Sequence, residues 1–419
     1  MQLLSLALVP ALLDVGSFAH PGHSIERDVH RRMHHLEHPA RRGVHECTND
    51  LQKRGWISHQ ADRRHARLNE LRERAGHKSL ARRDPSLDIE LFAHQAGCVL
   101  DPEVMEGPYW VAGELIRQDV RSGVGGKVEP GVALHLDINV IDVSNCQPIL
   151  DAYVELWGCN STGVYTGVVA RGNGDGNPAE IHNNALRGIQ PTAHNGTASF
   201  TTLFPGHYTG RANHLHSRPD LFFPQESQIE SYTFIQADQL TSTLVIIHHG
   251  ATRLQNDTIR GGAISHVGQI YFNEPLLKTV EATSPYMTNK QRWTPNDRDM
   301  LFRVGFQGGD NPIVQTQTIG SSIEDGIWGT IDVGVNPRAV RNPKNVNWWT
   351  EDGGMPNDGS PWDEFPGSGG ANPPKEAEPP NPPNPPEPSE TGNGPARALR
   401  RGGAIGGAMR SVRSFFAYA

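Results

Sequence analysis

A histidine pair separated by one residue is the strongest sign of chemistry in this sequence. His214 and His216 follow a Pro-Gly turn, and Tyr208 precedes His214 by six residues. On a strand, residues i and i+2 point to the same side, so both imidazoles can bind one ion. A phenol ionises at about pH 10, but a bound trivalent cation keeps it deprotonated. Tyr208 is therefore a candidate third ligand.

The combination of imidazole and phenol favours a ferric ion. Zinc sites rarely use tyrosine, whereas tyrosine on iron has precedent. A second tyrosine is available, since Tyr165 follows an expected strand and a Ser-Thr-Gly turn. Two phenolates stabilise Fe(III) against reduction and favour chemistry in which the iron activates an organic substrate. The alternative is that Tyr165 is a structural residue of a strand.

An arginine lies between the candidate ligands. Arg211 precedes His214 by three residues, where it can place a permanent charge beside a bound anionic substrate. The alternative is a surface ion pair. Because no Asp or Glu lies close to the ligands in the sequence to act as a general base, a hydrolytic metal site is disfavoured.

Short strands between turns must position these residues. The stretch "VALHLDINVID" alternates apolar and polar residues, which is the pattern of a half-buried strand. Four later stretches, "DAYVELWG", "TASFTTLF", "TSTLVIIHH" and "GQIYFNEPL", continue in the same style between Gly, Asn, Pro and Asp. No long helical pattern interrupts them. The sequence therefore predicts an all-β fold, a β-sandwich, for residues 102–340.

Composition excludes some classes of partner. The formal net charge of −8 argues against nucleic acid, because binding to its backbone needs a positive face. Charged residues make up 20% of the 419 residues, and this disfavours a membrane protein. The 45 glycines and 32 prolines are typical of a loop-rich β protein or of unfolded tails.

Several features predict export. Residues 1–19 are expected to form a signal peptide, because the apolar run is too short to span a bilayer and ends near a small-x-small site. The alternative is a disordered apolar start. Three N-glycosylation sequons lie on expected surface loops, at Asn160, Asn195 and Asn256.

Cysteine usage agrees with an oxidising compartment. Four cysteines fit two disulfides and allow three pairings: Cys47, Cys98, Cys146 and Cys159. Cys146 and Cys159 flank a strand and can close a small loop, while pairing with Cys47 or Cys98 stays open. We therefore expect a secreted, extracellular glycoprotein.

Both ends of the chain are expected to differ from the sandwich. Residues 20–101 hold eleven of the twenty histidines and few large apolar residues. They are interpreted as a partly disordered extension or pro-segment, with a metal-collecting arm as the alternative. One helical stretch there offers only Leu68 and Leu71 as an apolar stripe. Residues 341–419 form a Pro/Gly-rich tail, which is expected to be disordered and is a candidate for cell-wall association.

The quoted residues resemble a known family. The stretches "PGHYTGRANHLH", "VELWGCNSTGVYTG" and "GQIYFNEP", together with "EGPYW" and "IRQDVR", are similar to the intradiol ring-cleavage dioxygenases, and most of all to their secreted fungal branch. The resemblance covers residues from about Pro102 to Asn336. It implies one mononuclear non-haem Fe(III) ion, with O2 as co-substrate.

The resemblance also implies a role for each site residue. Tyr165, Tyr208, His214 and His216 would be the metal ligands, and Tyr208 would leave the ion when substrate binds. Arg211 would stabilise negative charge on the substrate. Gln269 matches a residue that lines the pocket. The substrate would be a catechol or hydroxyquinol, opened between its two hydroxyl-bearing carbons to give a muconate-type product.

Nearby residues carry expectations of their own. Trp110 and Trp157 are expected in the core or pocket wall, and His207 and His248 are expected to be packing or surface residues. Tyr109 either helps to wall the pocket or belongs to a turn. The alternative function is a non-catalytic secreted sandwich that binds aromatic or cell-wall-derived ligands. The presence of all four ligands with Arg211 favours the enzyme.

Overall fold

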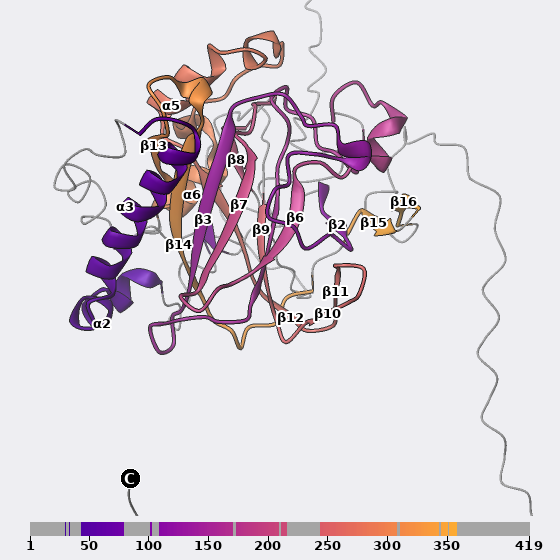
Figure 1. Ribbon diagram of the computed structural model, residues 1–419. Coiled ribbons are helices and arrows are strands. Elements are labelled where there is room, and N and C mark those ends of the chain that lie inside the picture. Colours follow the sequence, from indigo (N-terminus) through magenta and orange to yellow (C-terminus); the bar gives the residue numbers. More distant parts are fainter. Residues whose placement is uncertain are drawn as a thin grey trace, which may run out of the picture. The chain divides into compact units, whose positions relative to one another are not determined.

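The computed structural model describes residues 30, 33, 43–78, 101–102, 109–170, 173–208, 211–215, 244–307, 311–342, 345–350 and 352–357. Over these residues the chain is mostly β-sheet with a few helices (Figure 1). The expected β architecture is therefore confirmed in its coarse form. The helices show that the description "all-β" is too simple.

The first sheet carries part of the candidate metal loop. All its pairings are antiparallel, and β8 (His214–Leu215) pairs with β12 outside the main strand path. The strands of that path, in order, are β1 (Asp101–Pro102), β12 (Ala263–Tyr271), β9 (Leu244–His249), β5 (Tyr153–Trp157) and β6 (Arg187–Pro191).

The second sheet is mixed. Its central strand, β3, pairs in parallel with β14 and antiparallel with β4 and β7. Its strands are β13 (Gln315–Thr318), β14 (Ile327–Val335), β3 (Ala133–Asp142), β4 (Gln147–Pro148) and β7 (Thr197–Leu203).

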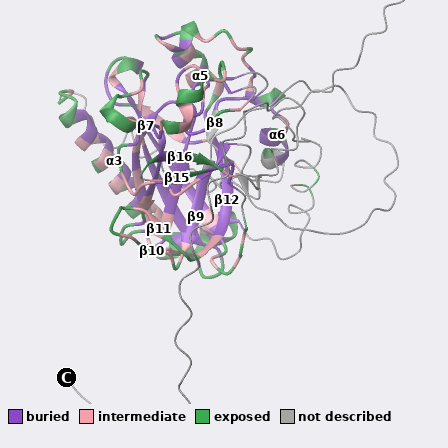
Figure 2. Cartoon of the chain, turned by 90° about the vertical axis from the view of Figure 1, so that its right-hand side faces the viewer, coloured by how far each residue is buried: buried purple, intermediate pink, exposed green. Residues whose placement is uncertain are grey.

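The two sheets enclose one apolar core. The alternating residues Leu134, Leu136 and Ile138 of β3 are fully buried, and they belong to one cluster with Val154 of β5 and Val245 of β9. Figure 2 shows β9 and β12 as buried strands. The predicted apolar face of this strand and the packing of two sheets on one core are confirmed, because a period of two places these apolar side chains on one face. The strand is not half-buried, however, since most residues of its other face are buried as well.

The remaining elements are short. The helices are α2 (Thr48–Lys53), α3 (Trp56–Arg74), α5 (Glu274–Glu281) and α6 (Met300–Gln307). Single turns of 3-10 helix are η1 (Val44–Cys47), η3 (Val124–Gly126), η4 (Pro178–His182), η5 (Tyr286–Thr288), η6 (Asn296–Arg298) and η7 (Ile323–Asp325). A hairpin joins β10 (Thr252–Arg253) and β11 (Ile259–Arg260). Among the described residues, no helix is long and apolar enough to span a bilayer.

The start of the expected tail is ordered. β15 (Asn347–Thr350) pairs antiparallel with β16 (Gly353–Pro356) and parallel with β2 (Val111–Ala112). Trp349 packs against an aromatic cluster of the sandwich. The expectation of disorder from residue 341 therefore does not hold for residues 345–350 and 352–357, because strand pairing and this aromatic contact hold them in place. Residues 358–419 lie outside the described part of the chain.

Helix α3 covers the polar face of the second sheet (Figure 1). Arg64 Nη2 lies 2.9 Å from Asp332 Oδ1 of β14, and both side chains are almost fully buried. Arg63 Nη2 donates to Asn139 Oδ1 of β3 at 3.2 Å. The polar residues that alternate with the core residues of β3 and β14 therefore lie on the face of the sheet that α3 covers.

A small apolar contact completes this interface. Leu68 and Leu71 pack with Ile319 and Trp328 in one buried cluster. Residues 43–78 are thus packed on the second sheet, while the interpretation of residues 20–101 as a partly disordered extension or pro-segment stays a prediction. Arginine side chains of α3 also contact the second sheet. An apolar stripe of only two leucines in the sequence does not indicate these contacts. The domain boundary at 101/102 stays a prediction.

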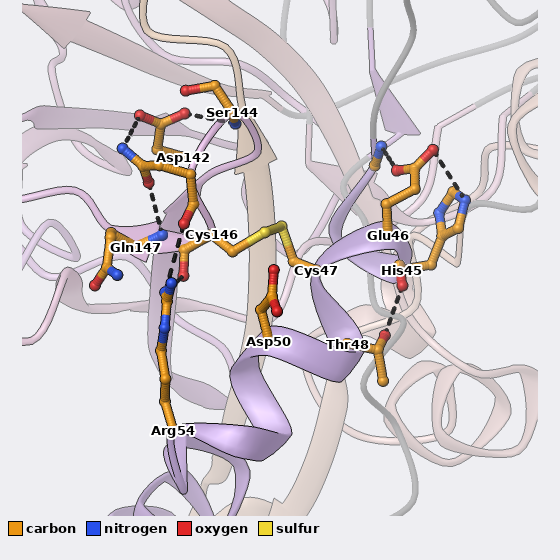
Figure 3. The surroundings of a disulfide bond; sticks show 12 residues. His45, Glu46, Cys47, Thr48, Asp50, Arg54, Asp142, Ser144, Cys146 and Gln147 are labelled. Atoms are coloured by element: carbon orange, nitrogen blue, oxygen red, sulfur yellow. Dashed lines mark hydrogen bonds and ion pairs between the residues drawn. A yellow bond between two sulfur atoms is a disulfide. The ribbon is translucent and has the colours of Figure 1, made fainter.

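A disulfide attaches the same segment to the sandwich. Cys47 at the end of η1 is bonded to Cys146 in the turn between β3 and β4, and Arg54 Nη1 donates to the Cys146 carbonyl at 2.9 Å (Figure 3). One disulfide is therefore confirmed. The suggested Cys146–Cys159 pairing is wrong, since Cys159 keeps a buried thiol that donates to the Gly206 carbonyl. Cys98 lies outside the described residues.

Candidate metal centre

The loop after β7 carries most of the candidate site. It runs from the end of β7 to His214 in β8, and residues 204–208 and 211–213 of it are buried. At Gly206 it passes so close to the Asn160–Ser161 backbone that an added Cβ would meet the Ser161 carbonyl oxygen at 2.3 Å. His214 then pairs with Tyr271 of β12. A tight turn and one strand pairing therefore define the course of this loop.

Two tyrosine hydroxyls meet in the interior. Tyr208 donates a hydrogen bond to the hydroxyl oxygen of Tyr165 at 3.3 Å, and their rings are edge-to-face. Tyr109 stacks on Tyr165 with ring centroids 4.5 Å apart. All three rings are buried. The structure thus brings the two phenols together from segments 43 residues apart and adds a third ring as a wall.

A structured turn presents Tyr165. The Asn160 side-chain oxygen accepts hydrogen bonds from the Thr162 and Val164 amides. Asn173 then accepts from the Tyr165 amide at 2.7 Å and donates to its carbonyl at 2.8 Å. Both backbone groups of Tyr165 are therefore bound by one amide side chain. This leaves little freedom in the direction of the ring.

Burial makes the phenols of Tyr208 and Tyr109 hard to ionise. It raises the pKa of Tyr208 well above its ordinary value, and the neighbouring Tyr165 and Tyr109 add to the effect. Burial also raises the pKa of Tyr109. A phenolate here needs a cation to compensate for the lost hydration. Two oxygens 3.3 Å apart can approach one ion, so these side chains suit a hard cation.

Arg211 is fully buried near Tyr208. Its Nε lies 2.6 Å from Asp299 Oδ2, and its Nη2 donates to Gln269 Oε1 at 3.0 Å and to the Tyr271 hydroxyl at 2.9 Å. Burial alone would lower the Arg211 pKa, but Asp299 and the neighbouring tyrosines raise it overall. The guanidinium is therefore a permanent charge. Its Nη1 is buried and has no hydrogen-bond partner among the described residues.

Asp299 fixes this arginine from a distant part of the chain. Its Oδ2 also accepts from the Ala212 amide, while its Oδ1 caps α6 by accepting from the Leu301 and Phe302 amides. One carboxylate therefore ties the arginine loop to the start of a helix. The sequence signals only the helix cap, since an Asp precedes the apolar run "MLFRV". The contact with Arg211 spans 88 residues.

Glu281, at the end of α5, holds both ends of the same loop. One oxygen lies 2.8 Å from His207 Nδ1, and the other accepts from the Asn213 side chain at 2.8 Å. His207 Nε2 lies 2.8 Å from the Gln291 carbonyl. Both ring nitrogens of His207 are thus occupied, in agreement with its expected packing role. Sequence reasoning missed Glu281, because nothing local marks its distant partners.

A second buried arginine contacts the segments that carry the tyrosines. Arg187 Nη2 donates to the Tyr109 carbonyl at 2.7 Å, and its Nε donates to the Thr166 carbonyl at 2.8 Å. Its Nη1 lies 3.5 Å from Glu114 Oε1. Burial raises the pKa of Glu114 to about 8, although the charge of Arg187 opposes this shift. Arg187 therefore ties together the two segments that supply the stacked rings.

The two tryptophans and His248 take structural positions. Trp157 and Trp110 are buried, and Trp110 Nε1 donates to Glu155 Oε1 at 2.8 Å. His248 Nε2 lies 2.8 Å from the other oxygen of Glu155. These placements agree with the expected core and packing roles.

The predicted site residues are partly brought together. Tyr165 and Tyr208 meet, Arg211 and Gln269 are hydrogen-bonded, and the backbone of His214 lies in β8 beside β12. His216 lies outside the described residues. Over the part of the chain that is described, no cluster of three or more His, Cys, Asp or Glu could hold a metal.

Comparisons with known proteins point to one group of structures. No protein-family model matches the sequence, and no curated protein matches it significantly. An intradiol ring-cleavage dioxygenase from Tetranychus urticae is 27% identical, with 60% of this chain and 100% of that chain covered and a TM-score of 0.42. The dioxygenase domain of a dioxygenase–carbohydrate-binding fusion from Streptomyces sp. SirexAA-E is 18% identical, with 56% and 97% covered and a TM-score of 0.29.

Catechol 1,2-dioxygenase from Pseudomonas arvilla C-1 is also similar, at 18% identity, with 56% of this chain and 62% of that chain covered and a TM-score of 0.31. The chain is thus similar in structure to intradiol ring-cleavage dioxygenases. Because these TM-scores are below 0.5, the similarity assigns no role to any residue.

Proposed function

We propose that this chain is a secreted non-haem Fe(III) dioxygenase of the fungal intradiol type, which opens catechols or hydroxyquinols between their two hydroxyl-bearing carbons. The observation that carries the proposal is the meeting of two buried phenols, Tyr165 and Tyr208, beside the buried charge of Arg211. For catechol itself the reaction adds one O2 and gives cis,cis-muconic acid.

Tyr165, Tyr208, His214 and His216 would hold the ion. Bound Fe(III) would supply Lewis-acid activation of the catecholate toward O2. Tyr208 Oη takes one catechol proton, because a buried phenolate that has no bound cation binds a proton tightly. Arg211 Nη1 is the donor still available to a substrate oxygen, and it acts at low dielectric, where its charge is strongest.

The surrounding residues orient the reacting groups. Asp299 and Gln269 set the plane of the Arg211 guanidinium, and Tyr109 holds the Tyr165 ring in place by stacking. Asp299 is thus a positioning residue. The apolar rings and buried loop exclude water from one side of the reacting centre.

The test is spectroscopic. Ferric tyrosinate gives a broad charge-transfer band in the visible range, and anaerobic catechol is expected to move this band to longer wavelength. Tyr165→Phe and Tyr208→Phe should each weaken or remove the band. Tyr153→Phe is the matched control, because Tyr153 lies on β5 outside the tyrosine cluster.

Measuring oxygen uptake distinguishes the proposed enzyme from the alternative, a non-catalytic binding protein. A protein that takes up iron and then consumes O2 with catechol, forming a ring-opened diacid, supports the enzyme. A colourless protein that takes up no iron on reconstitution, yet binds catechol, would favour the non-catalytic alternative.

A further inference from the structure

A polar groove lies between α3 and the second sheet, far from the tyrosines in the sequence. It has a volume of about 360 Å³ and continues into a second hollow of about 350 Å³. Gln60, Arg63 and Asn195 line both hollows. The combined volume lies within the range of small-molecule sites. The groove therefore has room for a ligand of several rings.

Two residues that line the groove carry buried hydrogen-bond donors without a partner in the described part of the chain. Gln60 and Arg64 line the groove and are 2% and 6% exposed, and their Nε2 and Nε atoms have no partner among the described residues. Buried donors are almost always satisfied. Two unsatisfied donors beside one groove indicate a polar occupant with acceptor oxygens.

The second hollow adds an apolar surface. Half-buried Trp56 and the ring of Pro148 line it, together with Gln60 and Asn195. An aromatic surface beside amide and guanidinium donors suits a sugar, because a pyranose ring has an apolar face and a rim of hydroxyl groups. The chemistry of the groove thus matches a saccharide carrying acetamido or hydroxyl oxygens.

A glycosylation sequon lies at the groove itself. Asn195 is exposed in the turn that leads into β7, and its side-chain oxygen accepts from the Thr197 amide at 3.0 Å. The Asn256 sequon lies instead in the exposed β10–β11 hairpin. Asn160 is half-buried, and its side-chain oxygen is engaged in the turn before Tyr165. Asn195 alone among the three lines the groove.

We propose that Asn195 carries an N-glycan whose first N-acetylglucosamine units lie in this groove and connect α3 to the second sheet. The sugar oxygens would accept from Gln60 and Arg64, and one ring would rest on Trp56. Attachment to Asn195 keeps the sugar at high effective concentration beside the groove, so weak contacts suffice. The glycan then holds α3 in addition to the Cys47–Cys146 bond.

This proposal rests on the proposed export but not on the proposed chemistry. The chain is produced with a heterologous leader in a eukaryotic host that adds N-glycans, so the result does not depend on residues 1–19 or on iron. Peptide mass mapping measures occupancy at each sequon. Hydrogen exchange of residues 56–74 and thermal unfolding measure the effect on α3.

Asn195→Gln is compared with the matched control Asn256→Gln. We expect Asn195→Gln to lower Tm by about 2–4 °C and to speed exchange in α3, while Asn256→Gln leaves both unchanged. The same pair is made without glycans in the bacterial periplasm, where disulfides form. There the Asn195→Gln effect should vanish, which separates the glycan from the asparagine side chain.

Three outcomes would overturn the proposal. The first is an unmodified Asn195 in the secreted protein. The second is equal exchange of α3 with and without the Asn195 glycan. The third is protection of α3 in the unglycosylated protein by added chitobiose but no protection by the attached glycan, which would make the groove a site for a free saccharide.

Discussion

Two fully buried arginines lie near the tyrosine cluster, and they are bound in different ways. Arg211 makes a close ion pair with Asp299 and keeps Nη1 without a described partner. Arg187 uses Nε and Nη2 on backbone carbonyls, and its Nη1, which also makes no hydrogen bond to the described residues, lies 3.5 Å from Oε1 of the Glu114 carboxyl group. The first arrangement presents a charge toward a ligand. The second fastens two chain segments together.

The largest effect is expected on stability, from Arg187→Met. Two buried carbonyls and Glu114 lose their partner, so we expect a loss of about 3–5 kcal/mol in the free energy of unfolding. Urea denaturation measures it. Arg121→Met, at an exposed ion pair, is the control and should change stability by less than about 1 kcal/mol. An Arg187→Met protein as stable as wild type would contradict the fastening role.

The next effect is expected on catalysis, from Arg211→Met. Removal of a donor aimed at developing charge should lower kcat by about a hundredfold to a thousandfold. Steady-state oxygen uptake measures kcat and KM, and the visible spectrum without substrate should keep its charge-transfer band. If only KM rises, Arg211 binds substrate and transition state equally, and the proposed charge stabilisation is wrong.

A smaller effect is expected from Asp299→Asn, which keeps an acceptor for the helix cap but removes the charge. We expect kcat/KM to fall by about tenfold, because the guanidinium loses its orientation. Asp299→Glu should restore part of the activity, whereas a purely structural role would predict losses that follow Tm in both variants. Parallel kinetic and thermal measurements on the two proteins decide between these cases.

The last prediction concerns pH and the Arg187 region. Because Glu114 has a pKa of about 8 in the fold, above its unfolded value, the native state binds one more proton than the unfolded state between about pH 4.5 and 8. The contribution of Glu114 to stability is therefore complete at low pH. It decreases through this window, by at most about 1.4 kcal/mol per pH unit.

Glu114→Gln tests this linkage. The glutamine side chain of the variant cannot ionise. The unfolding free energy of the wild type minus that of the variant should therefore decrease as pH rises through the window. Urea denaturation at several pH values measures it. A difference that is constant with pH would show that Glu114 is already ionised in the fold.

The sequence was informative wherever a residue's role depends on its immediate neighbours. The alternation in β3 predicted its core face, because strand periodicity is a local property. The H-x-H pair, the arginine three residues before it and the two tyrosines marked the candidate site. Each of these signals needs only spacing and side-chain chemistry to be seen.

The errors arose where distant segments meet. Residues 43–78 look polar and solvated by themselves, yet their arginines pair with Asp332 and Asn139 on the outer face of the second sheet. The order of the β15–β16 hairpin was missed for the same reason, because β15 pairs with β2, more than 200 residues away in the sequence. Composition averages over a segment and cannot show which face of another element will cover it.

The sequence by itself determined the β-sandwich pattern and the set of residues that can do chemistry, since both follow from local periodicity and functional groups. Only the tertiary structure decided that Tyr208 meets Tyr165, that Asp299 holds Arg211 and that Cys47 is bonded to Cys146. These pairs lie 43, 88 and 99 residues apart. Their partners are selected by the packing of whole elements, which no short stretch of sequence contains.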